Sequence, residues 1–122
     1  MFRWLASVLR SFGPAVAGLL WALKTQRNLQ VHVIATVLVV IFGLWLKIAV
    51  WEWCVILLAA GMVITAELLN TALEVLADRV TQEREEAIRR VKDAAAAAVL
   101  VAALAALCVG LLIFLPKLWR LL

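Results

Sequence analysis

Long apolar runs divide the chain into segments that each match the length of a membrane-spanning helix. The first run, residues 29–46, and the third, residues 94–115, contain no Asp, Glu, Lys or Arg. The second run, residues 51–78, is largely apolar to Ala66 and keeps a helical period while polar residues enter its later half. A helix needs about 20 apolar residues to cross a bilayer. The pattern therefore predicts an all-α integral membrane protein with three transmembrane helices.

The N-terminal segment, residues 1–27, has a different pattern. Apolar residues recur there at helical spacing, with Arg3 and Arg10 between them. This spacing is typical of an amphipathic helix lying in the membrane interface. Gly13-Pro14 is expected to break or bend that helix near its middle. A cleaved signal peptide is the alternative, although its apolar stretch would be short and lie behind a proline.

Two connecting features complete the predicted organisation. Residues 79–93 are expected to form a helical connection, with Thr81 as a cap and Glu85–Arg89 and Glu86–Arg90 as favourable i,i+4 pairs. Pro116 is expected to end the third transmembrane helix. Small residues, Ala94 to Ala98 among them, would let that helix pack closely against others.

Composition narrows the class of protein. The 122 residues are 67% hydrophobic and 16% charged, against about 45–50% and about 25% in soluble domains. These values exclude a cytosolic globular enzyme, a disordered chain and a disulfide-built secreted module, and predict one membrane domain over residues 1–122. Cys54 and Cys108 lie in apolar runs and are expected to be reduced. The net charge of +4 is better explained by anionic lipid than by nucleic acid.

The basic residues predict an orientation in the membrane. Three of them, Lys47, Lys117 and Arg120, fall on one side of a three-span arrangement. Nine fall on the other side: Arg3, Arg10, Lys24, Arg27, Arg79, Arg84, Arg89, Arg90 and Lys92. Cytoplasmic loops carry the excess of Lys and Arg. The N-terminus and the 79–93 connection are therefore expected to face the cytoplasm.

A polar stripe in the second predicted span carries the candidate chemistry. Glu67, Asn70, Glu74 and Asp78 are spaced by three, four and four residues and so share one helical face. A carboxylate near the centre of a span costs about 2.5–3.5 kcal/mol on insertion scales. A polar seam between helices is one interpretation of the stripe. Several acids on one face also repel one another, which favours a bound metal, a proton path or acid–base catalysis.

Lys92-Asp93, just before the third span, can return to the side of this stripe. Divalent metal, lysine and a carboxylate base are the components that phosphoryl transfer requires. No standard nucleotide-binding motif or zinc spacing is present. Two other classes stay open from the residues alone: a small ion or proton transporter and a non-catalytic membrane subunit. His32, the single histidine, is interpreted as an interfacial side chain that bonds a neighbour.

The segments AELLNTALEVLADR (66–79) and VKDAAAAAVL (91–100) resemble the small prokaryotic diacylglycerol kinase family. The stretch from Ser11 to His32, with its TQRN segment, is similar to the branch that phosphorylates undecaprenol. The resemblance covers about residues 10–115. It implies ATP-dependent phosphorylation of a membrane lipid alcohol, undecaprenol or diacylglycerol, at the cytoplasmic face of the bacterial inner membrane. It also implies Mg²⁺ as the cofactor and a homotrimer whose active sites lie between subunits.

The same resemblance implies roles for individual residues. Glu67 matches the catalytic carboxylate, a general base on the lipid hydroxyl. Glu74 matches a carboxylate that holds magnesium on the ATP phosphates. Gln26 stands where better-known members have a second metal-binding glutamate, which puts that second metal contact in doubt. The remaining matched positions are nucleotide-site residues: Asn70 and Lys92 on the phosphates, Asp78 and Asp93 as acids, and Arg10 near ATP phosphate or a lipid headgroup.

Overall fold

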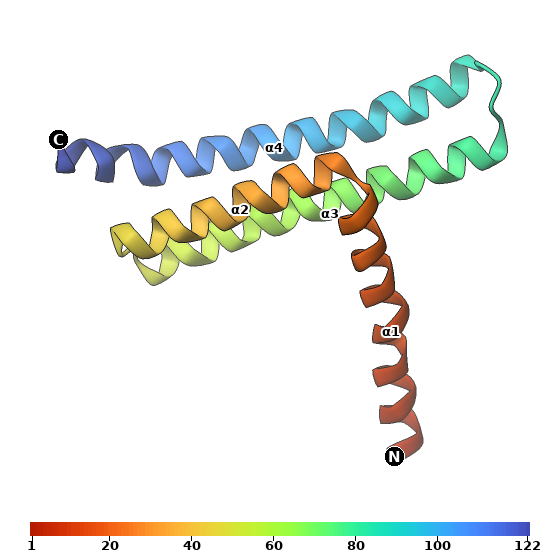
Figure 1. The fold of residues 1–122 in the computed structure, drawn as a ribbon, viewed down its shortest axis with the longest axis horizontal. Coiled ribbons are helices and arrows are strands. Elements are labelled where there is room, and N and C mark those ends of the chain that lie inside the picture. The colour runs from red at the N-terminus through yellow and green to blue at the C-terminus, as the bar shows by residue number, and fades with distance from the viewer.

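The computed structural model describes all 122 residues and consists of four helices (Figure 1). They are α1 (Phe2–Thr25), α2 (Arg27–Leu46), α3 (Val50–Val80) and α4 (Glu86–Leu121). By length and composition, each of the four is apolar enough to cross a membrane. The all-helical prediction is confirmed, and the structure is that of a membrane protein. Because α1 is also long and apolar enough to span a membrane, the number of transmembrane helices stays a prediction.

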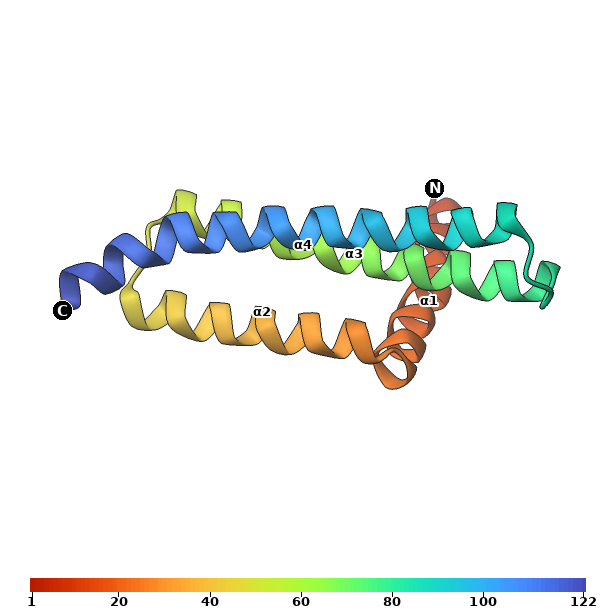
Figure 2. The ribbon, with the colours of Figure 1, turned by 90° about the horizontal axis from the view of Figure 1, so that it is seen from above.

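Helices α2, α3 and α4 run side by side as a narrow bundle, and α1 leaves it at the end where α2 begins (Figures 1 and 2). A small core of Ile48, Ile56 and Ile113 lies at the opposite end of the bundle. Only 14 of the 122 residues are buried, so most apolar side chains remain on the surface of the single chain. Such a surface is stable only against lipid or against other subunits.

The turn between α2 and α3 is tight and well defined. The N–H groups of Lys47 and Ile48 bond back to Leu44 O and Gly43 O, and Lys47 has a left-handed φ of 52°. This pattern is a Schellman motif, which satisfies the last carbonyls of a helix. Helix α3 then begins with a capping interaction, in which Ala49 N donates to Glu52 Oε1 at 2.9 Å.

Neither proline interrupts its helix, so the expected break at Pro14 and the expected end of the helix at Pro116 are both wrong, whereas a bend at Pro14 stays a prediction. Helix α1 continues through Pro14 without a break, and α4 continues five residues beyond Pro116 to Leu121. A proline removes one backbone donor and one helical bond. Apolar surroundings offer the remaining backbone groups no water as a substitute, so each helix retains its other bonds and persists.

The connection between α3 and α4 is shorter and less helical than expected. Residues 81–85 are not helical, and α4 begins at Glu86. The hydroxyl of Thr81 accepts a hydrogen bond from Glu83 N at 3.0 Å, which stabilises the turn instead of capping α4. Of the expected ion pairs, Arg90–Glu86 forms at 3.4 Å, whereas Arg89 pairs with Glu86 at 2.6 Å rather than with Glu85.

Candidate functional site

The polar stripe of α3 runs from a buried carboxylate to an exposed one. Glu67 and Asn70 are 2% and 8% exposed, Glu74 is half-buried and Asp78 is exposed near the end of the helix. Seven residues separate Glu67 from Glu74, which is about 10 Å along a helix at about 1.5 Å per residue. The stripe thus places carboxylates at different depths on one rigid element.

Glu67 has a single polar partner. His32 Nε2 on α2 lies 3.2 Å from Glu67 Oε1, and the two side chains are 26% and 3% exposed. The contact agrees with the sequence interpretation that His32 bonds a neighbour, while its position at the membrane interface stays a prediction. That the neighbour is the deepest carboxylate of the stripe was not foreseen, because no sequence spacing relates residue 32 to residue 67.

Asn70 links the stripe internally. Its Nδ2 donates to Glu74 Oε1 at 3.4 Å. Its Oδ1 is the one buried side-chain oxygen without a hydrogen-bond partner. An unsatisfied buried carbonyl oxygen costs free energy, and next to a carboxylate it provides a second oxygen ligand for a cation.

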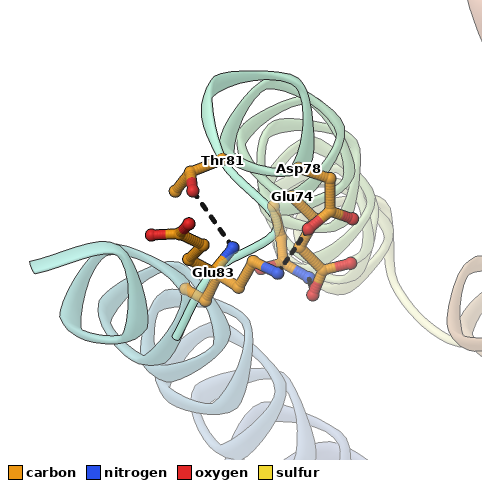
Figure 3. A network of polar contacts seen from close by, with 6 residues as sticks. Glu74, Asp78, Thr81 and Glu83 are labelled. Atoms are coloured by element: carbon orange, nitrogen blue, oxygen red, sulfur yellow. Dashed lines mark hydrogen bonds and ion pairs between the residues drawn. The ribbon is translucent and has the colours of Figure 1, made fainter. Parts of the chain in front are cut away.

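The two sides of the α3–α4 turn meet through Asp78 and Lys92. Lys92 Nζ lies 2.5 Å from Asp78 Oδ1, so the chain does return to the stripe as expected. Figure 3 shows Glu74 and Asp78 at the end of α3, with Thr81 and Glu83 in the turn that follows. Asp93 is exposed and has no ion-pair partner.

A polar cavity of about 510 Å³ opens beside this turn, and Asp78 and Lys92 both line it. The other lining residues are Thr81, Gln82, Glu83, Arg84, Glu85, Glu86, Ile88 and Arg89. The cavity combines basic side chains with carboxylates and is open at the surface of the protein. It is suitable for a charged ligand that comes from water.

Two of the expected site residues form no hydrogen bond or ion pair with the stripe. Gln26 joins α1 to α2, and its amide donates to the Thr25 hydroxyl at 3.1 Å rather than contacting Glu74. Arg10 is exposed on α1 and forms no ion pair. No group of three His, Cys, Asp or Glu side chains is close enough to hold a metal ion within one chain.

Two buried polar features were missed by the sequence reasoning. Thr71, 4% exposed, lines a pocket of about 310 Å³ between α1 and α3. Glu52 at the start of α3 is 5% exposed and pairs with Lys117 of α4 at 3.1 Å. For Glu52, the available signal was a glutamate within an apolar run, since such a residue requires a partner. The two cysteines are free, as expected.

Comparisons with known proteins identify the family of this chain. The family profile "Prokaryotic diacylglycerol kinase" matches residues 13–114. An undecaprenol kinase of Bacillus subtilis is 41% identical over 109 residues, 89% of each chain. A diacylglycerol kinase of Synechocystis is 41% identical over 113 residues, 92% of this chain and 65% of the relative. A diacylglycerol kinase of Escherichia coli is 28% identical over 99 residues, 81% of each chain.

The fold and the site define a membrane-embedded helical protein with a buried carboxylate on α3 and a charged cavity at the end of that helix. The chain belongs to the prokaryotic diacylglycerol kinase family. It is accordingly an enzyme of the lipid kinase class.

Proposed function

We propose that the protein transfers the γ-phosphate of ATP to the hydroxyl of a membrane lipid alcohol at the cytoplasmic face of the bacterial inner membrane. The buried Glu67 carries the proposal, because it lies about 10 Å deeper than Glu74 on the same helical face. A lipid hydroxyl is held near the membrane surface, whereas ATP comes from water. A helix with carboxylates at both depths supports a reaction between the two.

In this proposal ATP binds on the outer part of the stripe. Lys92 and Asn70 contact the phosphates, and Asp78 and Asp93 contribute the acids of the nucleotide site. The cavity next to Asp78 and Lys92 supports this placement. Arg10, exposed on α1, is placed near phosphate or a lipid headgroup.

The residues beside Glu74 fit a magnesium ion. Mg²⁺ prefers oxygen ligands and is held by one or two carboxylates together with phosphates and waters. Glu74 and the unpartnered Asn70 Oδ1 supply such oxygens, and the amide oxygen of Gln26 is a further candidate. When bound, the ion would neutralise charge on the phosphates.

The chemical step requires a base at the acceptor. Glu67 accepts the proton of the lipid hydroxyl while that oxygen bonds to the γ-phosphorus. The bond from the γ-phosphorus to the bridging oxygen breaks, and ADP leaves with the electron pair. The carboxylic acid then returns its proton to water.

The proposed arrangement in the membrane is three spans, α2 to α4, with α1 as an interfacial helix and the N-terminus in the cytoplasm. The excess of basic residues around α1 and the α3–α4 turn supports this orientation. A homotrimer with shared sites is also proposed. The largely exposed apolar surface of the single chain supports such an assembly.

The acceptor is undecaprenol or diacylglycerol, and undecaprenol is favoured. The TQRN segment and the following His32 resemble the undecaprenol branch of the family. The relative from Bacillus subtilis, named undecaprenol kinase, aligns over 89% of both chains.

Labelled ATP and each lipid, supplied separately in mixed micelles with purified protein, test this function. Wild-type protein should label at least one lipid, and Glu67→Gln should lose about 10²- to 10⁴-fold in kcat, the usual contribution of a general base. Glu52→Gln is the matched control, since it neutralises a buried carboxylate at the other end of α3. Label in neither lipid, or full activity in Glu67→Gln with normal folding, would contradict the proposal.

A further inference from the structure

The contact between His32 and Glu67 joins two helices at the deepest point of the candidate site. His32 belongs to α2 and Glu67 to α3, and their side-chain atoms are 3.2 Å apart. A buried carboxylate needs donors to remain an anion in a medium of low dielectric. The structure places one side-chain nitrogen, His32 Nε2, 3.2 Å from one of the two carboxylate oxygens of Glu67.

No other group competes for this imidazole. His32 lies at the edge of a cavity of about 260 Å³ between α2, α3 and α4, where α4 contributes apolar residues and glycine only. Thr36 also lines the cavity, but its hydroxyl donates to the backbone carbonyl of His32 at 2.8 Å. Lys24 and Arg27 are exposed and form no ion pair, so neither substitutes as a donor to Glu67.

We propose that His32 is a positioning residue for the Glu67 base. The Nε2–H of His32 donates to Glu67 Oε1 and fixes the carboxylate, which leaves Oε2 to accept the proton of the lipid hydroxyl. This inference rests on the proposed role of Glu67 as base. It concerns the orientation of the base and not the binding of ATP. The proposed ATP site lies further out on α3.

The geometry explains why a donor from α2 suits this role. His32 reaches Glu67 from a second helix, α2, so the contact holds the carboxylate from across the helix interface. A hydrogen bond to a charged group is stronger than one between neutral groups. In apolar surroundings the contact therefore restricts the carboxylate to one orientation.

A pair of amide substitutions tests the role of the Nε2–H. In His32→Gln the amide nitrogen occupies about the place of Nε2, so kcat should stay within about threefold of the wild type. In His32→Asn the amide is too short to reach Glu67, and kcat should fall about 10- to 100-fold, with KM for ATP unchanged. Thermal unfolding in detergent checks that both variants are folded.

The substitution His32→Asn, made in the Glu67→Gln background, provides the decisive control. If His32 acts through Glu67, His32→Asn should cause no further loss there, because coupled residues are not additive. Wild-type kcat in His32→Asn, or equal loss in the Gln and Asn variants, would overturn the inference. Full activity in Glu67→Gln would instead contradict the proposal that Glu67 is the base. The failure of that proposal and the failure of the role of His32 are therefore distinguishable.

Discussion

At the scale of single residues, Gln26 is the position where the resemblance implies a departure from the family pattern. Its side chain supplies an amide oxygen but no negative charge, and in the structure it bonds to Thr25. A neutral ligand attracts Mg²⁺ less strongly than a carboxylate does. The proposed metal site therefore has one negative charge fewer than a site with glutamate at this position.

Substitution Gln26→Glu should restore that charge. We expect the Mg²⁺ concentration for half-maximal activity to fall about 2- to 10-fold, because hard divalent cations favour carboxylate ligands. Activity at fixed ATP over a range of Mg²⁺ concentrations measures the effect.

Asn28→Glu is the matched control, since Asn28 is exposed nearby and makes no hydrogen bond. It adds the same charge without a placed ligand and should change the Mg²⁺ requirement little. An equal shift in both variants would show that only the local potential matters, which would contradict a ligand role for residue 26.

At the scale of elements, the α2–α3 hairpin depends on the absence of a side chain at residue 43. A Cβ at Gly43 would lie 2.7 Å from Trp53 Cη2 and 3.1 Å from Ile48 Cδ1. Both distances are shorter than normal contacts, so the Trp53 ring would have to shift. The ring packs against the core of Ile48, Ile56 and Ile113.

Gly43→Ala should therefore destabilise the protein by about 1–3 kcal/mol, the usual cost of overpacking. Thermal unfolding in detergent measures this change. Gly110→Ala is the control, because nothing lies within 4 Å of a Cβ placed there. That variant should be neutral or slightly stabilising, since alanine favours a helix over glycine. Equal stability of the two variants would show that Trp53 moves without cost.

At the scale of the whole molecule, one chain leaves its largest groove open. The groove lies between α3 and α4, has a volume of about 970 Å³ and includes Asn70 among mostly small and apolar residues. Small residues allow membrane helices to approach closely. The open groove supports a site that is completed by a second copy.

Mixed assemblies test shared sites. Glu67→Gln and Lys92→Ala chains should each be nearly inactive, whereas the two refolded together should recover activity well above either parent. Recovery requires that a site takes Glu67 from one subunit and Lys92 from its neighbour, because some sites in the mixture then contain both intact residues. Lipid phosphorylation by the mixture measures it.

The control mixture combines Glu67→Gln with the Glu67→Gln/Lys92→Ala double variant. No site in this mixture contains an intact Glu67, whichever subunits form it. Activity of the first mixture no higher than that of the control would contradict sites that combine Glu67 and Lys92 of different subunits.

Much of the architecture could be predicted from the apolar pattern. Long uncharged runs form helices in a membrane because the backbone has no other hydrogen-bond partners there. The same reason explains why Pro14 and Pro116 were misjudged. Proline rules derived from soluble proteins overestimate how strongly a proline interrupts a helix in an apolar segment. The turn at 81–85 was misjudged because the Thr81 hydroxyl can serve a turn or a cap equally well.

The candidate site could be predicted where its residues lie on one helix. Helical periodicity places Glu67, Asn70, Glu74 and Asp78 on one face before any packing is known. Whether these residues hold ATP and magnesium is still a prediction. The pair Glu52–Lys117 joins residues 65 positions apart, and no local rule relates them.

The sequence by itself determined the class of environment, the helices and the polar face of α3, because these depend on composition and on the period of one helix. Only the tertiary structure decided that His32 of α2 meets that face at Glu67. It also decided which carboxylate the expected return of Lys92 reaches, namely Asp78. Such contacts depend on how each helix is rotated and shifted against its neighbours. That arrangement is set by packing over the whole bundle, which no single segment encodes.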